Sequence, residues 1–400
     1  MSGSPLTSSM VIAFAAVLAP ILAHLLRRVI QVPAVVLQIL LGVLVGPVVL
    51  GWVKVNTEVG LLSDFGLAVL MFMAGYEIEF DRIRGRPIRL ATIGWLVSLV
   101  LGMAFGMVIA GFTLKAQLVG LVVTTTALGT ILPMVRDAGA LGSPFGGRVL
   151  AIGALGEFGP IVLLALITTE GSRWHTIALM AVFALVAVIA AGMASRPRHP
   201  VLAHLVTATM DTSGQLGIRI VMFILIAMLW LADVFNLDVL LGAFAAGLVI
   251  RLAANAGPEP EERIIGIKLD AIAFGLFVPF FFVVSGVKLD IKSMIADPGS
   301  MVLIPVFFLL FLLVRGLPTY LLHRGDTDLR PGESRALALF ASAALPLVVV
   351  ITSTGVEAGV LDPATAAAMV TAGVVSVLVY PLVALRLYRS ADQKWEDQPA

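Results

Sequence analysis

Two ionisable side chains of this chain lie where ionisable groups are costly. Glu157 falls within an apolar run over residues 147–169, and Arg315 falls within another over residues 301–322. Crossing a bilayer takes about 20 apolar residues, so each run is long enough to span a membrane. A charged side chain at mid-membrane depth costs roughly 2.5–3.5 kcal/mol on insertion scales and usually serves a function. One buried acid and one buried base therefore indicate an ion- or proton-coupled carrier.

The depth of the two residues favours a working pair. Glu157 is close to the midpoint of its run, whereas Arg315 is about four residues from the centre of its own, or roughly 6 Å at 1.5 Å per residue. An arginine side chain can cover that distance. We expect the Glu157 carboxylate to hold either a proton or a monovalent cation, with Arg315 compensating its charge. The alternatives for Arg315 are a fixed structural ion pair and a side chain that snorkels to the inner surface.

These residues need a frame of many helices. Hydrophobic residues make up 60% of the chain and charged residues 13%, whereas a soluble domain is about 25% charged. The apolar runs lack the period-two alternation of barrel strands. We predict an all-α membrane protein with about 13 transmembrane helices, near residues 10–26, 33–51, 60–77, 88–111, 116–135, 147–169, 174–194, 215–233, 236–250, 267–286, 299–322, 334–357 and 363–386.

The basic residues predict the orientation of these spans. With the N-terminus outside, 19 of the 26 lysines and arginines fall in cytoplasmic loops and five fall on the opposite side. Such a bias is the usual sign of the cytoplasmic face. It predicts an odd number of spans and a C-terminus inside.

Short matches between the two halves suggest an internal repeat. The triplet LLG occurs at 40–42 and 240–242, and FGL occurs at 65–67 and 274–276. Both matches pair spans that are seven apart, and an odd offset reverses the direction through the membrane. Two inverted repeats are a signature of alternating-access carriers.

The same offset pairs span 116–135 with span 334–357, and both are interrupted by proline. Proline removes an amide donor and frees carbonyls, and nearby hydroxyl groups can satisfy them. Two such spans in corresponding positions point to the binding site of a carrier. We expect unwound helices marked by Gly129, Pro133 and Pro346, and cation ligands from Thr126, Thr130 and Ser342 in addition to Glu157.

Other classes of chemistry find no support in the sequence. There is no cysteine, which excludes disulfides and thiolate metal sites. The histidines show no metal-binding spacing, and no nucleophile–base set suggests an enzyme. No groove-binding motif argues for nucleic acid, and no cofactor is expected. The glycines at 42, 46, 242 and 247 are typical of close helix packing.

Five segments taken in order resemble the monovalent cation:proton antiporters of the sodium/hydrogen exchanger superfamily, in the bacterial antiporter-2 branch. The resemblance covers nearly the whole chain. The segments are VPAVVLQILLGVLVGPVVLG (32–51), FGLAVLMFMAGYEIEFD (65–81), TTTALGTILPMVRDAG (124–139), VLLGAFAAGLVI (239–250) and PFFFVVSGVKLDI (279–291).

The resemblance also suggests roles for single residues. The family carries its ion-binding aspartate in the helix after the unwound one, often behind another polar residue. Here the matching segment is GALGEFGP (153–160), with Gly156 at the first position and Glu157 at the second. This chain departs from the pattern in both positions, which leaves ion selectivity and stoichiometry open. Arg315 matches the basic residue of the second repeat.

The resemblance implies a division of the chain into a moving core and a fixed scaffold, and it implies a homodimer built on the scaffold. We expect scaffold spans in 1–87 and 201–297, core spans in 88–170 and 298–388, a linker span in 171–200 and a cytoplasmic tail in 389–400.

Together these features predict a secondary antiporter of a bacterial inner membrane that exchanges Na⁺ or K⁺ for protons. A single titrating carboxylate predicts electroneutral exchange. The alternatives are a sodium-coupled organic-anion carrier of related fold, and a channel or sensor without turnover. Two roles are open for Glu77. It is expected either to line the inner entrance to the ion site or, in the simpler interpretation, to join an interfacial cluster with Glu79, Asp81 and Arg82.

Overall fold

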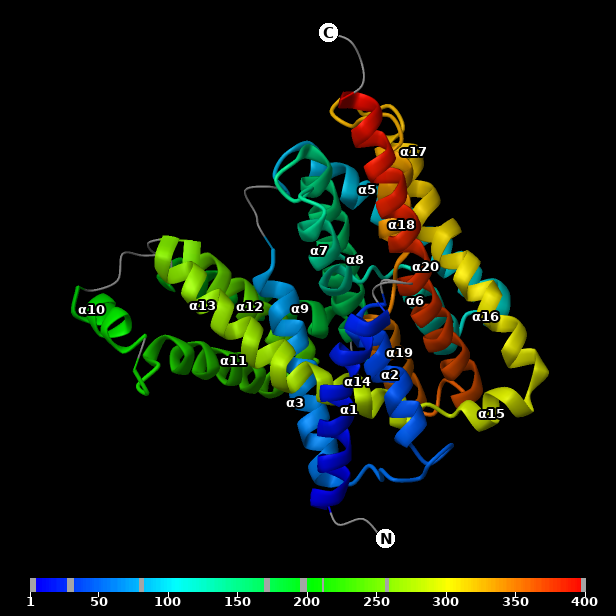
Figure 1. Cartoon of the computed structure of the whole chain (residues 1–400), viewed down its shortest axis with the longest axis horizontal. Coiled ribbons are helices and arrows are strands. Elements are labelled where there is room, and N and C mark those ends of the chain that lie inside the picture. The colour runs from blue at the N-terminus through cyan, green and yellow to red at the C-terminus, as the bar shows by residue number, and fades with distance from the viewer. Residues whose placement is uncertain are drawn as a thin grey trace. The chain divides into compact units, whose positions relative to one another are not determined.

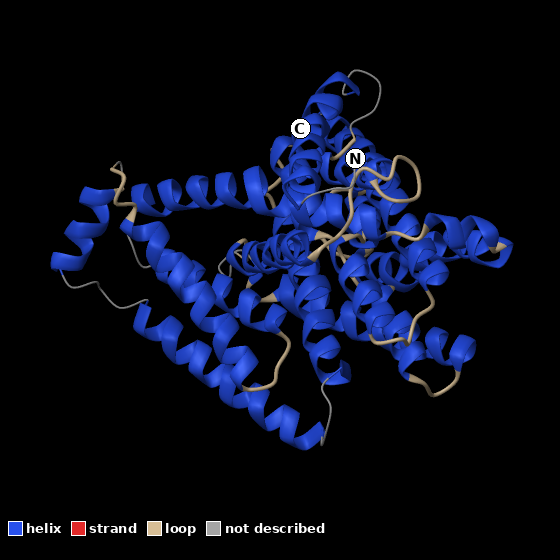
Figure 2. Cartoon of the chain, turned by 90° about the horizontal axis from the view of Figure 1, so that it is seen from below, coloured by secondary structure: helices blue, strands red, loops and turns tan. Residues whose placement is uncertain are grey.

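The computed structural model describes residues 5–26, 32–78, 83–168, 173–194, 200–210, 212–255 and 259–396. Every regular element in these ranges is a helix, and none of them contains a strand (Figure 2). The all-α prediction is thereby confirmed. Glu79, Asp81 and Arg82 of the expected interfacial cluster lie outside the described residues.

The helices form two compact units. The first comprises residues 1–55, 79–167 and 283–400, and the second comprises residues 56–78 and 168–282. Compactness alone does not identify which helices move, so the core and scaffold boundaries remain a prediction.

The first unit contains the elements that carry Glu157 and Arg315 (Figure 1). Its helices are α1 (Pro5–Leu26), α2 (Ala34–Val45), α5 (Arg86–Ala110), α6 (Leu114–Val122), α7 (Leu128–Asp137), α8 (Pro144–Thr168), α15 (Ile291–Ala296), α16 (Pro298–Leu310), the π-helix η2 (Phe311–Gly316), α17 (Leu317–His323), α18 (Glu333–Ser342), α19 (Pro346–Glu357) and α20 (Pro363–Glu396).

The second unit is built around α3 and α12. Its helices are α3 (Thr57–Tyr76), α9 (Arg173–Ala194), α10 (Pro200–Thr209), α11 (Leu216–Val234), α12 (Val239–Asn255), α13 (Glu259–Ile272) and the π-helix η1 (Ala273–Phe277). Helix α14 (Val278–Lys288) continues η1 and contains the boundary between the units.

The apolar helices agree with the predicted spans. Each predicted span coincides with one helix or with consecutive helices. In the described ranges nine helical segments are long and apolar enough to cross a membrane, and three apolar helices are shorter. The span predicted at 116–135 is divided between α6 and α7. The exact count of 13 crossings therefore remains a prediction.

Small residues let several helices approach closely. A Cβ atom built on Gly102 of α5 would lie 2.5 Å from the Gly120 carbonyl of α6, and one built on Gly120 would lie 2.7 Å from the Gly102 carbonyl. Any side chain at either position would push these two backbones apart. The expected packing role is also confirmed for Gly42, Gly242 and Gly247, whose Cβ atoms would overlap the backbone of another helix. A Cβ atom on Gly46 would lie 3.2 Å from the Val287 Cα, which is a tight contact.

Two helices of the first unit are interrupted, as expected for crossing unwound helices. The first break lies between Val122 of α6 and Leu128 of α7, and the second lies between Ser342 of α18 and Pro346 of α19. The hydroxyl groups of Thr124 and Thr125 donate to carbonyls in the last turn of α6, at 2.8 and 2.9 Å. These bonds satisfy acceptors that the end of a helix leaves open.

The prolines of the two broken helices have different positions. Pro346 lies in the first turn of α19, where a missing amide costs nothing because that amide has no partner within the helix. Gly129 and Pro133 follow the first break and belong to α7. The missing amide of Pro133 therefore does not end α6. The break between α6 and α7 is stabilised instead by hydrogen bonds to other segments, from Thr126 to Gly156 and from Ala127 to Ala343.

Candidate ion-binding site

Glu157 lies in the middle of α8 and is 3% exposed. Its Oε1 accepts a long hydrogen bond of 3.4 Å from the backbone N–H of Gly129. Gly129 is the second residue of α7, so its N–H belongs to the first turn, where helix amides lack intrahelical partners. The positive end of the α7 dipole therefore faces the carboxylate.

Thr126 joins α8 to both helix breaks. Its backbone N–H donates to the Gly156 carbonyl at 3.0 Å, directly before Glu157 in the chain. Its hydroxyl donates to the Ala341 carbonyl at 2.7 Å. The next residue, Ala127, donates its N–H to the Ala343 carbonyl at 2.7 Å. The two breaks are thus hydrogen-bonded to each other beside the buried carboxylate.

Arg315 lies in η2 and is 1% exposed. Its Nε donates to the Thr126 hydroxyl at 3.0 Å, and its Nη2 donates to the Ile152 carbonyl of α8 at 2.9 Å. The guanidinium group thus contacts α8 five residues before Glu157, and it shares Thr126 with the breaks. A buried cation at this place lowers the electrostatic cost of a buried carboxylate nearby.

The glycine at position 156 makes room for these contacts. A Cβ atom there would lie 2.5 Å from the Thr126 Cβ and 2.9 Å from the Arg315 Nη2. Real Cβ atoms essentially never come as close as 2.5 Å to another heavy atom. Gly156 is the first position of the two-residue pattern that the family resemblance pointed to. The space beside it is filled by the side chains of Thr126 and Arg315.

The remaining predicted ligands are buried and close to the breaks. The Thr130 hydroxyl donates to the Ala127 carbonyl at 2.9 Å, and the Ser342 hydroxyl donates to the Ala338 carbonyl at 2.8 Å. A hydroxyl group that donates its proton keeps lone pairs for a cation. Their role as cation ligands, like that of Thr126, remains a prediction.

Glu77, the predicted entrance residue, belongs to the other compact unit. It caps the C-terminus of α3 and is half-buried. Its role at an entrance remains a prediction.

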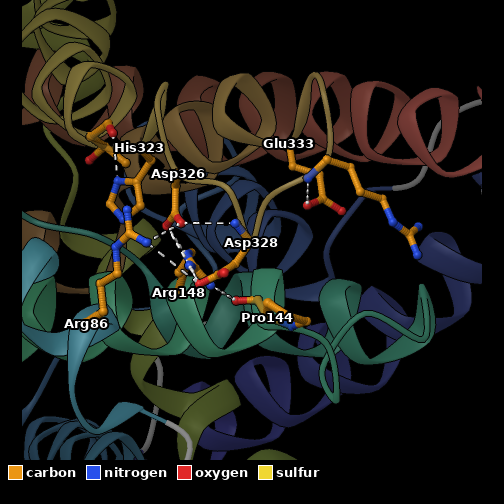
Figure 3. A network of polar contacts seen from close by, with 9 residues as sticks. Arg86, Pro144, Arg148, His323, Asp326, Asp328 and Glu333 are labelled. Carbon is orange, nitrogen blue, oxygen red and sulfur yellow. Dashed lines mark hydrogen bonds and ion pairs between the residues drawn. The ribbon is translucent and has the colours of Figure 1, made fainter. Parts of the chain in front are cut away.

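A second group of charged residues in the first unit was not anticipated from the sequence (Figure 3). Arg148 of α8 is 3% exposed at its side chain, and Asp326 is 0% exposed. The Arg148 Nε lies 2.6 Å from Asp326 Oδ2, and its Nη2 lies 2.9 Å from Asp328 Oδ2. Arg86 at the start of α5 approaches the other Asp326 oxygen at 3.2 Å. This network ties α5 and α8 to the segment between α17 and α18.

Arg148 is the second residue of the apolar run 147–169. A basic residue at the end of a run is typical of a loop that flanks a membrane span. Hydropathy gave no signal of its burial. In the structure α8 already begins at Pro144, so Arg148 lies one turn inside the helix. Its partner could not be identified, because Asp326 and Asp328 follow 178 and 180 residues later in the chain.

The first unit thus places a buried carboxylate beside two joined helix breaks, within a set of apolar helices. The transmembrane sodium/hydrogen exchanger family matches residues 13–387, and the chain belongs to this family. It is accordingly an integral, multi-pass membrane protein of a transporter family, as predicted from the sequence. That agrees with the expectation that it is not an enzyme.

Named relatives and a solved structure are similar over most of the chain. YjbQ of Bacillus subtilis is 26% identical over 422 residues, which cover 99% of this chain and 65% of YjbQ. The Na⁺/H⁺-K⁺ antiporter GerN of Bacillus cereus is 23% identical over 87% of this chain and 88% of GerN. The sodium proton antiporter MjNhaP1 of Methanocaldococcus jannaschii superimposes with a TM-score of 0.64 at 16% identity, covering 96% of each chain. This last likeness confirms the fold.

Proposed function

We propose that this protein exchanges a monovalent cation, Na⁺ or K⁺, for protons by alternating access, with Glu157 as the group that carries either ion. The observation that carries the proposal is the burial of this carboxylate beside the first turn of α7, next to the two joined breaks. A site with one carboxylate can be neutralised by a proton or by a monovalent cation, but not by both at once. Competition for it is the simplest basis for exchange.

The coupling rule follows from the cost of a bare charge in a dry environment. When Glu157 is protonated or holds a cation, the site is nearly neutral and can cross a low-dielectric barrier. When Glu157 is charged and empty, moving it costs several kcal/mol. The empty, charged site therefore stays in place, and a leak of either ion is prevented.

Oxygen ligands complete the proposed site. Alkali cations are hard ions, and hard ions prefer carboxylate, hydroxyl and carbonyl oxygens. Thr126, Thr130 and Ser342 are buried hydroxyl residues at the two breaks. The name of GerN mentions both sodium and potassium, which supports testing both ions.

We further propose that exchange is electroneutral, one cation for one proton, because a single carboxylate changes its state. The protein acts in this proposal as a homodimer in a bacterial inner membrane, with the N-terminus outside and the C-terminus inside. The bias of basic residues toward one set of loops supports this orientation.

The test uses purified protein in liposomes with a pH-sensitive dye inside. A pH gradient is imposed, and Na⁺, K⁺ or Li⁺ is then added outside. We expect a cation-driven pH change in the wild type and none in Glu157→Gln, whose amide cannot exchange a proton. The rate should not respond to an imposed membrane potential. Exchange in folded Glu157→Gln would place the ion site elsewhere, and a strong response to potential would refute electroneutrality.

A further inference from the structure

Pro160 lies inside α8, three residues after Glu157, and is buried. Proline has no backbone N–H, so it cannot donate to the carbonyl four residues earlier. Its ring also crowds that carbonyl and tilts it away from the helix axis. In α8 the carbonyl in question belongs to Gly156, the residue directly before Glu157.

The released carbonyl has a partner from another element. Thr126 lies in the break between α6 and α7, where its N–H has no place in a helical ladder, and it donates to the Gly156 carbonyl at 3.0 Å. An acceptor freed by proline and a donor freed by the break thus satisfy each other. Buried backbone groups need such partners, since an unpaired one costs about 1–3 kcal/mol.

The bond between the Thr126 N–H and the Gly156 carbonyl also fixes the Thr126 side chain. Thr126 also holds the Arg315 Nε through its hydroxyl, and the same hydroxyl bonds to the Ala341 carbonyl of the second broken helix. The position of Arg315 relative to Glu157 therefore depends on where Thr126 is docked on α8. Because Pro160 has no N–H, the Gly156 carbonyl stays available to accept the Thr126 N–H.

Another buried proline inside a helix of the first unit lacks this arrangement. Pro381 interrupts α20 and releases the Val377 carbonyl. Among the described residues, no backbone N–H from a different element donates to that carbonyl. A proline kink alone does not produce the contact seen at Gly156.

We propose that Pro160 is a positioning residue for ion exchange: it leaves the Gly156 carbonyl free to dock Thr126, and Thr126 in turn holds Arg315 at its place beside the Glu157 site. This inference rests on the proposed function of Glu157. It concerns affinity for the cation rather than the chemistry of the carboxylate.

The principal variant is Pro160→Ala, which restores a donor that competes for the Gly156 carbonyl. We expect the half-saturating cation concentration to rise about fivefold, the factor for losing one hydrogen bond. Because protons and cations compete for one carboxylate, the pH of half-maximal exchange should move upward by about 0.7 at a fixed cation concentration well above both half-saturating values. The maximal rate at saturating cation should change less than the half-saturating concentration.

Two controls separate the missing donor from the shape of the ring. Pro381→Ala, in the matched buried helix, should keep the cation dependence and pH profile of the wild type. A backbone ester at position 160, made by incorporating an α-hydroxy acid, has neither the ring nor the N–H and should also behave like the wild type. An ester that behaves like Pro160→Ala would refute the proposal.

The partner side gives an independent variant if Pro160→Ala does not fold. A backbone ester at position 126 removes the Thr126 donor and leaves Pro160 in place, and it should produce the same rise in half-saturating cation concentration. Hydrogen exchange of the segment 123–127 should be faster in Pro160→Ala. Unchanged cation dependence and pH profile in either variant, with normal exchange by the wild type, would overturn this inference alone. Absence of exchange in the wild type would instead refute the proposed function.

Discussion

The backbone N–H of Ala127 donates to the carbonyl of Ala343 at 2.7 Å, so the two broken helices of this exchanger-family protein are bonded directly at their breaks. Each break exposes amides and carbonyls that no helix satisfies. The Ala127–Ala343 bond satisfies one group from each break. Glu157 lies beside this junction and Arg315 is bonded to it through Thr126, so geometric changes at the junction should be felt as changes in ion binding.

Shortening the acidic side chain should weaken binding without abolishing it. Glu157→Asp keeps a carboxylate but withdraws it by one methylene from the Gly129 N–H, which is already 3.4 Å away. We expect the half-saturating cation concentration to rise at least about fivefold, for one lost hydrogen bond, with exchange retained. Dye-loaded liposomes provide the measurement, and complete loss of exchange in a folded protein would contradict the prediction.

A methyl group at position 156 should disturb the junction. Gly156→Ala places a Cβ 2.5 Å from the Thr126 Cβ and 2.9 Å from the Arg315 Nη2. Overpacking of this kind typically costs about 1–3 kcal/mol, so both the melting temperature and the exchange rate should fall. Gly192→Ala in α9 is the control, because nothing lies within 4 Å of its Cβ and alanine stabilises an open helical site by about 0.4–1 kcal/mol. Equal melting temperatures for the two variants would refute this account.

The geometry at Arg315 should make lysine a poor substitute. Arg315 donates from two different nitrogens to Thr126 and to the Ile152 carbonyl, whereas lysine has a single ammonium group and cannot reproduce the fork. We expect Arg315→Met to reduce the apparent cation affinity or rate about tenfold or more, since bonds to charged groups are worth about 1.5–3 kcal/mol each. Arg315→Lys should fall between Met and the wild type. Wild-type kinetics in folded Arg315→Met would exclude a role for this charge.

The Arg148 network should matter for stability. Removing one member of a buried ion pair costs about 3–5 kcal/mol when the other charge is left unpaired. Arg86 still faces Asp326 in Arg148→Met, so the cost should lie below this range, but the variant should still melt at a clearly lower temperature than the wild type. Lys115→Met is the matched control, because the Lys115–Asp362 pair is 39% and 48% exposed at its side chains and exposed pairs contribute about 0–1 kcal/mol. Thermal unfolding in detergent, followed by loss of monodisperse protein, measures both. Similar losses for the two variants would show that burial does not strengthen the Arg148 network.

Much of the architecture could be predicted from local features of the sequence. Apolar runs as long as a bilayer is thick can only be helices, since no water satisfies their backbone in lipid. A carboxylate in the middle of such a run stands out for the same reason, so Glu157 was recognisable before its surroundings were known. Arg315 stood out likewise. The interruption of the spans at 116–135 and 334–357 was signalled by their hydroxyl residues and prolines.

What the tertiary structure decided is which of these groups meet. Arg315 bonds to Thr126, 189 residues away, and Arg148 bonds to Asp326, 178 residues away. Hydropathy is a property of one segment, whereas a hydrogen bond between helix breaks depends on how two distant segments cross. The exact place of the first break, before Gly129 and Pro133, also depended on the partners available to Thr126 and Ala127. Sequence alone thus determined the helices and the buried charges of Glu157 and Arg315. Packing decided their partners and buried the Arg148–Asp326 pair, because only the folded chain brings an orphaned donor to an orphaned acceptor.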